Sequence, residues 1–327
     1  MKVHILDDWF DTLRGLASFE RLAGHEVTIY NDHVKDVDEL AHRLAPAEAV
    51  VLFRERTPIT RELLDKLPDL KLISQRSVYP HVDVAACTEN KVLLCSNMHS
   101  DTPCTAAAEL TFALILASAR QLPQQMASLK AGNWQMGVGQ TLSGRTLGLY
   151  GYGRIARQVA SYARAFGMNI IWWSSDEGRQ RARADNETVA DSRTAFFAKA
   201  DFVSVHVRLK PETRGIITAD DLLAMKTSAT FVNTSRAGLV AKNALEQALA
   251  AGRPGRIALD VFDLEPLHDA NDPVTSHPNV IGTPHIGYVT EDEFDLQFAD
   301  IYDQINAYAE GKPIHMINPE VWTSNQR

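Results

Sequence analysis

The stretch Thr146-Leu-Gly-Leu-Tyr-Gly151-Tyr-Gly153-Arg154-Ile155-Ala156 indicates how this chain of 327 residues folds. It begins as a short apolar run of strand type, turns at glycines, and continues with apolar residues at helical spacing. A second apolar run follows at residues 168–173. The stretch therefore predicts a β-turn-α-β unit.

The two glycines of this turn predict a dinucleotide site. Gly151 and Gly153 allow a tight turn and a close approach of the backbone to a pyrophosphate, while Ala156 allows the helix to pack closely on the strand. The N–H groups at the start of the helix, at Arg154 and Ile155, point toward such a phosphate. Glycines also mark ordinary tight turns, but the strand before and the helix after this turn favour the dinucleotide site.

The second strand of the unit ends without the acid that usually holds the ribose hydroxyls. Ser174 and Ser175 occupy that place and are followed by Asp176. Either Asp176 serves from a slightly extended strand, or the serines and an arginine accept a 2′-phosphate. The arginines that follow, at 179, 181 and 183, equally suit a solvated helix face. We expect NAD(H) as cofactor, with NADP(H) as the alternative.

Composition limits the class of protein. The chain is 45% hydrophobic and long enough for two domains, and its net charge of -8 argues against nucleic-acid and membrane-surface partners. Cys87, Cys95 and Cys104 have no metal-binding spacing, so we expect no metal site and no disulfide framework. The chain begins with a strand-like run instead of a signal peptide, and no apolar run is long enough to cross a bilayer. We expect a soluble, cytoplasmic protein.

Strand-like runs alternate with helical segments along the chain. The expected strands lie at 3–6, 27–30, 50–53, 72–74, 92–95, 202–207, 230–233, 256–260 and 280–281, in addition to the two of the glycine unit. The expected helices include 11–23, 37–44, 219–225, 242–251 and 291–310. This alternation predicts the α/β class, with parallel sheets covered by helices on both faces.

Three polar side chains in the second half follow strand-like runs, where crevices form in open α/β sheets. Arg236 can bind a carboxylate bidentately, His285 can exchange a proton near neutral pH, and Glu265 can fix the tautomer of that histidine. Taken singly, they read as a surface ion pair, a loop histidine and a helix-end charge. Together they supply what hydride transfer to a 2-keto acid needs from a protein.

These segments resemble the D-isomer-specific 2-hydroxyacid dehydrogenase family over essentially the whole chain. The resemblance rests on residues 142–156, on 204–215 with its Ser-Val-His-Val-Arg-Leu-Lys-Pro-Glu-Thr-Arg-Gly, and on 231–238, 258–266 and 283–287. It implies that Arg236 binds substrate, that His285 is the acid/base with Glu265 as its partner, and that Asp260 holds the nicotinamide carboxamide. It also implies that His206, Thr213 and Thr234 lie in loops that line the cofactor.

The resemblance further implies two doubly wound parallel-sheet domains. A Rossmann NAD(P)-binding domain, residues 102–290, would be inserted in a flavodoxin-like substrate domain made of 1–101 and 291–327. A homodimer would form through the nucleotide domain, and the partner molecule would be a small 2-keto or 2-hydroxy acid.

One turn of the first domain departs from the family pattern. The family offers glycine-rich backbone N–H groups to the substrate carboxylate, and here Arg76, Ser77 and Val78 occupy that turn. The amides of Ser77 and Val78 could still serve. Arg76, together with Arg54 and Arg56, could bind a second anionic group such as a phosphate, or could make structural ion pairs.

Two other functions remain open from the sequence. One is a non-catalytic, NAD-sensing binding protein on the same fold, and the other is a relative that acts on formate or phosphite. The combination of Arg236, Glu265 and His285 favours the dehydrogenase.

Overall fold

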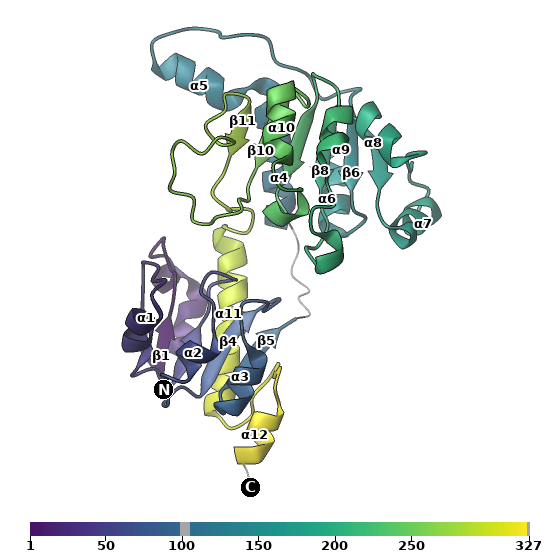
Figure 1. Ribbon diagram of the computed structural model, residues 1–327. Coiled ribbons are helices and arrows are strands. Elements are labelled where there is room, and N and C mark those ends of the chain that lie inside the picture. The colour runs from purple at the N-terminus through teal and green to yellow at the C-terminus, as the bar shows by residue number, and fades with distance from the viewer. Residues whose placement is uncertain (99–104, 326–327) are drawn as a thin grey trace. The chain divides into compact units, whose positions relative to one another are not determined.

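The computed structural model describes residues 1–98 and 105–325 and divides the chain into two compact α/β units (Figure 1). Unit 1 comprises Met1–Thr102 and Thr290–Arg327, and unit 2 comprises Pro103–Val289. The chain thus leaves unit 1, builds unit 2 and returns. Each unit contains one parallel sheet, which confirms the predicted fold class. Cys104 lies outside the described residues.

Unit 1 is built on a five-stranded parallel sheet in the order β2-β1-β3-β4-β5. Its strands are β1 (Lys2–Ile5), β2 (Glu26–Ile29), β3 (Ala49–Val51), β4 (Leu72–Arg76) and β5 (Leu93–Asn97). The central strand β3 is buried along its whole length, because helices cover the sheet on both sides. This order is that of the flavodoxin-like doubly wound sheet.

The helices of unit 1 come from both ends of the chain. They are α1 (Val37–Leu44), α2 (Arg61–Leu64), α3 (Val84–Glu89), α11 (Glu291–Ala309) and α12 (Glu320–Asn325). The long helix α11 returns from unit 2 and packs on β4 and β5 (Figure 1). Its apolar face buries Phe294, Phe298 and Tyr302, and the rings of Phe53 and Phe294 meet edge to face at 5.2 Å.

The predicted α-helix at residues 11–23 is wrong. Two short 3-10 helices occupy the segment, η1 (Leu13–Gly15) and η2 (Ala17–Leu22). Leu16 between them is extended, with φ -77° and ψ 143°, so the helical hydrogen bonds cannot continue through it. The buried carboxylate of Asp8 accepts the amides of Thr12 and Leu13 instead. A local contact between a buried side chain and the backbone therefore takes the place of the regular helix that the apolar spacing indicated.

Unit 2 is built on a six-stranded parallel sheet in the order β11-β10-β9-β8-β6-β7. Its strands are β6 (Thr146–Tyr150), β7 (Asn169–Trp173), β8 (Phe202–Val205), β9 (Thr230–Asn233), β10 (Arg256–Leu259) and β11 (Val280–Gly282). A parallel bridge from Trp172 to Val189 adds one more paired position beside β7. The strand order reverses at β6, because the chain moves first to β7 and then to β8 on the other side.

Helices cover both faces of the unit 2 sheet (Figure 1). Residues of α4 and α6 share one buried cluster with Leu149, and residues of α8, α9 and α10 share another with Phe231. The helices are α4 (Thr105–Arg120), α5 (Leu122–Lys130), α6 (Arg154–Ala165), α7 (Asp176–Ala184), α8 (Arg193–Lys199), α9 (Ala219–Ala224) and α10 (Ala244–Ala251), with 3-10 turns η3 (Pro211–Thr213) and η4 (Ala237–Leu239). Burial between two helical layers explains why the strands read as continuous apolar runs.

Within residues 1–98 and 105–325, no helix has the length and apolar character needed to cross a membrane. In the same residues, no cluster of three or more His, Cys, Asp or Glu side chains could hold a metal ion. Cys87 and Cys95 are buried free thiols, and burial raises the pKa of each to about 12. Both cysteines therefore act as small core residues.

We predict that Asp221→Asn destabilises unit 2 by about 2 kcal/mol at pH 7, because a buried carboxylate that accepts charge-assisted hydrogen bonds is lost. Asp221 is 7% exposed, caps α9 through Thr218 and pairs with Arg193 at 2.6 Å. Burial opposes ionisation, but the bonds from Arg193 and Thr218 lower the Asp221 pKa. The stability contributed by the ionised Asp221 side chain is thus fully present above the ordinary aspartate pKa, and it is lost as the pH falls through the lowered Asp221 pKa. Urea unfolding of the wild type and the variant, at pH 7 and at a pH below the lowered Asp221 pKa, measures this contribution.

The matched control is Asp220→Asn, which changes an exposed acid in the same first turn of α9. Its unfolding midpoint should stay close to that of the wild type at every pH. Equal losses in the two variants would contradict the role given to the Arg193 pair.

Candidate functional site

The turn after β6 forms a cradle that side chains do not fill. Gly151 has φ 112°, and a Cβ there would lie 2.3 Å from the carbonyl oxygen of His206. Gly153 precedes α6, and no described heavy atom lies within 4 Å of the position that its Cβ would take. The fold therefore requires glycine at Gly151, whereas Gly153 leaves open space at the N-terminus of a helix. This arrangement fits the pyrophosphate of a dinucleotide.

The residues predicted for the ribose lie at the end of β7. Ser175 caps α7, because its Oγ accepts the amide of Gly178 at 3.2 Å. The carbonyl of Ser174 accepts a hydrogen bond from Arg179 at 2.5 Å. Asp176 is the first residue of α7 and pairs with Arg179, so the strand does not extend to present it.

The predicted cofactor residues on the other loops fall into two groups. The hydroxyls of Thr213 and Thr234 are already bonded, to the carbonyl of Arg208 at 2.7 Å and to the hydroxyl of Thr111 at 2.7 Å. His206, at the end of β8, bonds to Ser204 through Nε2, while its buried Nδ1 has no hydrogen-bond partner. Burial lowers the His206 pKa to about 4, so the ring is neutral. An unpartnered nitrogen beside the Gly151 turn fits a ligand group.

Asp260, directly after β10, organises the turn that carries His285. The carboxylate is fully buried and accepts the hydroxyl of Thr283 at 2.6 Å and the amides of Ile286 and Gly287 at 2.9 Å each. Burial raises the Asp260 pKa despite these bonds. Three bonds on both sides of His285 hold that residue at φ 54°, a conformation that an unsupported histidine rarely adopts.

His285 and Glu265 form a hydrogen-bonded pair. His285 Nδ1 lies 2.6 Å from Glu265 Oε2, and the amide of Phe262 holds the other carboxylate oxygen at 2.9 Å. Burial would raise the Glu265 pKa, but the bond to His285 and the nearby charges lower it overall. The side chains are 29% and 34% exposed, so solvent or a ligand reaches them. The ionised carboxylate accepts the Nδ1 proton and leaves Nε2 for exchange.

Arg236 completes the group. It follows β9, and its charge is one of the causes that lower the Glu265 pKa. One guanidinium nitrogen donates to the carbonyl of Ser235 at 2.8 Å, and this bond restrains the guanidinium group. Arg236, Glu265 and His285 thus follow β9, β10 and β11, which are neighbours in one parallel sheet. The carboxyl ends of such strands meet at one edge, so the structure brings the three predicted catalytic residues together.

The predicted substrate residues lie in unit 1, after β3 and β4. Arg54 and Ser77 both have positive φ, 60° and 77°, in loops at the same edge of that sheet. The amide of Ser77 donates to the carbonyl of Asn97 at 3.1 Å, which differs from the expectation that it is offered to a ligand. The amide of Val78 follows it in the same loop.

The cations of this edge are held within unit 1. Arg76 is 9% exposed in its side chain and pairs with Asp300 of α11 at 3.1 Å, so it makes the structural ion pair that was the alternative to a phosphate contact. The Arg56 guanidinium lies 4.6 Å from the ring centroid of Trp9 and 4.5 Å from that of Phe53, and it donates to the carbonyl of Asp7.

Two residues of the site were missed in the sequence. Thr283 holds Asp260, and the ring of Tyr288 meets that of His285 edge to face at 5.7 Å. Thr283 begins the segment 283–287 and Tyr288 directly follows it, but neither spacing nor periodicity distinguished them from ordinary loop residues.

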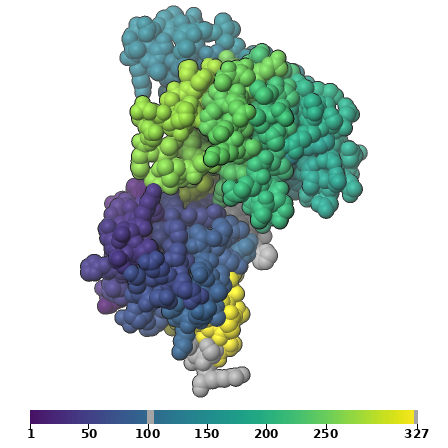
Figure 2. Space-filling view, in the orientation of Figure 1, coloured from purple at the N-terminus to yellow at the C-terminus, as the bar shows by residue number. Residues whose placement is uncertain are grey.

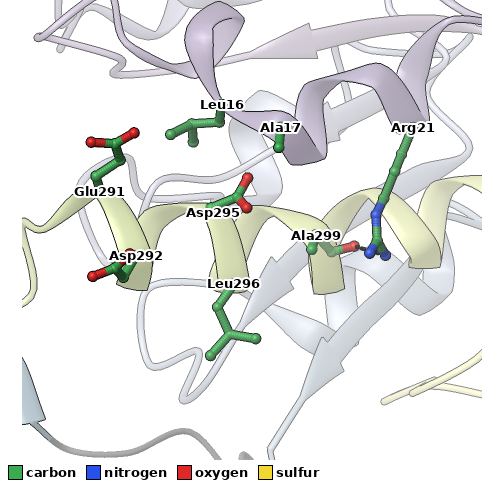
Figure 3. Close-up of a pocket in the computed structure, with 8 residues that line it drawn as sticks. All are labelled: Leu16, Ala17, Arg21, Glu291, Asp292, Asp295, Leu296 and Ala299. Atoms are coloured by element: carbon green, nitrogen blue, oxygen red, sulfur yellow. Dashed lines mark hydrogen bonds between the residues drawn. The ribbon is translucent and has the colours of Figure 1, made fainter.

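A pocket of about 340 Å³ lies elsewhere, between η2 and α11 in unit 1 (Figure 3). It contains none of the predicted site residues, and its carboxylates would repel an anionic ligand. Its lining residues are Leu16, Ala17, Arg21, Glu291, Asp292, Asp295, Leu296 and Ala299. We do not assign the chemistry to it.

Comparisons with known proteins identify relatives of this chain. Residues 112–287 match the model of the D-isomer specific 2-hydroxyacid dehydrogenase, NAD binding domain. The chain is 45% identical to a phosphoglycerate oxidoreductase from Vibrio cholerae O395 of known structure, over 95% of this chain and 99% of that one, with a TM-score of 0.90. It is 37% identical to the D-3-phosphoglycerate dehydrogenase of Methanocaldococcus jannaschii over 84% of this chain, and 34% identical to the glyoxylate reductase of Thermococcus litoralis over 82% of each. The chain spans about half the length, 52%, of the Methanocaldococcus protein.

We predict that the two glycines respond differently to alanine. Gly153→Ala should leave the thermal midpoint within about 2 °C of the wild type and weaken NADH binding by tenfold or more, because only ligand space is filled. Gly151→Ala should lower the midpoint strongly, since its Cβ would collide with the His206 carbonyl. Calorimetric unfolding and NADH titration measure both effects. Unchanged NADH affinity in Gly153→Ala would argue against the cradle.

Proposed function

Because the chain belongs to the D-isomer-specific 2-hydroxyacid dehydrogenase family, we propose that it transfers a hydride between a nicotinamide cofactor and C2 of a small 2-keto or D-2-hydroxy acid. The observation that carries this proposal is the 2.6 Å contact between His285 Nδ1 and Glu265 Oε2, with Arg236 close enough to lower the Glu265 pKa. These groups suit proton transfer and carboxylate binding.

We assign the cofactor to the edge of the unit 2 sheet at the end of β6. When bound, the nicotinamide supplies the hydride transfer itself. The backbone at Gly151 and Gly153 approaches the pyrophosphate, and the amides of Arg154 and Ile155 at the start of α6 donate to it. Loop residues that follow β7 to β10 line the remainder, namely Ser174, Ser175, His206, Thr213, Thr234 and Asp260.

His285 exchanges the proton. Since the ionised Glu265 accepts the proton on Nδ1, Nε2 is the atom that gives a proton to the developing alkoxide oxygen in keto-acid reduction. In the oxidative direction, neutral Nε2 takes the proton from the C2 hydroxyl. Glu265 fixes the tautomer of the ring and keeps it in one orientation. The turn fixed by Asp260 prevents the ring from drifting.

Arg236 binds the substrate carboxylate and polarises the C2 oxygen. A guanidinium offers two parallel N–H donors to a carboxylate, and this fork orients the keto acid. In unit 1, the amide of Val78 is our candidate for a further carboxylate contact, because the amide of Ser77 is already bonded. Arg54 is our candidate for contacting the substrate side chain.

We also propose a homodimer formed through unit 2. Helix α5 buries none of its residues, and apolar side chains of α5 and the segment after it are exposed, including Met126 (58%), Leu129 (60%) and Trp134 (75%). Figure 2 shows this part of the chain as a projection from the rest of unit 2. An apolar surface of this kind is typical of a subunit interface. The free, buried thiols of Cys87 and Cys95 suit the reducing cytoplasm that we propose as its location.

The activity is tested by initial rates of NADH and NADPH oxidation with glyoxylate, pyruvate, hydroxypyruvate and 3-phosphohydroxypyruvate. Turnover of any of them supports the proposal. A clear preference for the phosphorylated substrate would assign Arg54 and Arg56 to a phosphate. Cofactor binding without any turnover would favour the nucleotide-sensing protein or the formate-type relative.

We predict that His285→Gln lowers kcat for reduction by about 10³-fold and leaves the NADH dissociation constant unchanged, because it removes only the proton donor. Glu265→Gln should lower kcat by about tenfold or more. Initial rates over a range of substrate concentrations measure kcat of both variants. Wild-type rates in His285→Gln would remove the acid/base assignment.

We predict that Leu129→Asp converts the dimer to monomer, because a charge in an apolar interface is unfavourable. Light scattering after size-exclusion chromatography measures the mass. Ile314→Asp, a similar change at an exposed site of unit 1, is the control and should leave the mass unchanged. A monomeric wild-type protein would reject the dimer.

A further inference from the structure

We propose that the cofactor site accepts a 2′-phosphate on the adenosine ribose, so that the protein binds NADP(H) as well as NAD(H), with Arg179 as the residue that determines this specificity. The inference rests on the dinucleotide site proposed above. It concerns only the end of β7, where Ser174 and Ser175 replace the acid that excludes a 2′-phosphate in NAD-specific folds.

Asp176 does not take the place of the missing acid. It is the first residue of α7, and its side chain is 83% exposed. Its Oδ1 is paired with Arg179, so its charge is directed to solvent and partly balanced. Asp185, another acid of this region, accepts the hydroxyl of Tyr152 at 2.5 Å. A phosphate at the end of β7 would therefore not meet an unpaired carboxylate of either residue.

Arg179 is held against the end of β7. Its Nη1 donates to the carbonyl of Ser174 at 2.5 Å, and its Cζ lies 4.3 Å from the centroid of the Trp173 ring. The side chain is only 22% exposed. These contacts order the guanidinium before a ligand arrives, which reduces the entropy cost of binding. Bonds to Ser174 and Asp176 engage two of its five N–H donors, and the fork geometry suits a phosphate.

Further positive charge lies at the same end of the sheet. The guanidinium groups of Arg157 and Arg181 lie 5.8 Å and 5.9 Å from the ring centroid of Tyr152, which stands between the two glycines of the cradle. Tyr152 follows β6, the neighbour of β7. Because the carboxyl ends of parallel strands share an edge, these cations add to the attraction for a ribose phosphate.

The test uses the adenosine end alone, so it does not depend on turnover. Calorimetric titration at low ionic strength compares 5′-AMP with adenosine 2′,5′-bisphosphate, and NAD⁺ with NADP⁺. We expect the bisphosphate to bind about tenfold more tightly than 5′-AMP, and NADP⁺ to bind at least as tightly as NAD⁺. Arg179→Ala should abolish the tenfold preference and leave NAD⁺ binding unchanged. Arg183→Ala, at an exposed arginine of the same helix, is the matched control and should keep the preference.

A second variant restores the acid without disturbing the helix. Ser175→Asp keeps a good N-cap residue for α7 and adds a carboxylate at the strand end. It should weaken NADP⁺ binding by tenfold or more and so shift the preference from NADP⁺ to NAD⁺. Thermal midpoints of all variants verify that they are folded.

The outcomes separate this inference from the proposed function. NAD⁺ binding without a preference for the 2′-phosphate, or an unchanged preference in Arg179→Ala, would overturn the inference alone. Failure of the wild type to bind any of the four nucleotides would overturn the dinucleotide site as well.

Discussion

The close approach of the Gly151 backbone to the carbonyl of His206 is the constraint on which the rest of unit 2 depends. A Cβ at Gly151 would lie 2.3 Å from that oxygen, so the loops after β6 and β8 can lie side by side only with glycine there. β6 pairs with β7 on one side and with β8 on the other. The chain therefore changes direction at β6, and a crevice at the carboxyl ends of the strands is the expected ligand site of such a sheet.

The polar residues of this edge have different tasks because they differ in burial. Asp260 is fully buried, and its three hydrogen bonds shape the turn around His285. Glu265 is partly exposed, remains ionised and bonds to the histidine ring itself. One carboxylate thus fixes the backbone and the other fixes the tautomer. Both carboxylates position Nε2 of His285, the nitrogen that we propose as the proton donor, although neither acid needs to touch a substrate for this purpose.

The arginines of the chain show why residue type alone does not assign a role. Arg76 is the last residue of β4, and Arg179 lies in α7, the helix that follows β7. Arg76 is buried against Asp300 of α11, which is more than two hundred residues away in the sequence, and this ion pair belongs to unit 1. Arg179 is paired with a largely exposed acid of its own helix and stacked on Trp173, so it stays at the surface of the sheet edge. The two arginines differ because the carboxylate that pairs with Arg76 is largely buried, whereas the carboxylate that pairs with Arg179 is largely exposed.

The sequence by itself determined the α/β class, the glycine cradle and the order Arg236, Glu265, His285, because alternating apolar periods and strand-end polar residues are local patterns. The folded structure decided which contacts individual residues make, because local patterns do not contain this information. The buried carboxylate of Asp8 binds backbone amides at the start of 11–23, where two 3-10 helices stand in place of the expected helix. Asp300 forms an ion pair with Arg76, and the carbonyl of Asn97 accepts the amide of Ser77. The Arg76–Asp300 and Ser77–Asn97 contacts join residues that are distant in the sequence, whereas the Asp8 contact is local but depends on the burial of that carboxylate. Their hydrogen bonds outweigh local propensity, which is a weak preference.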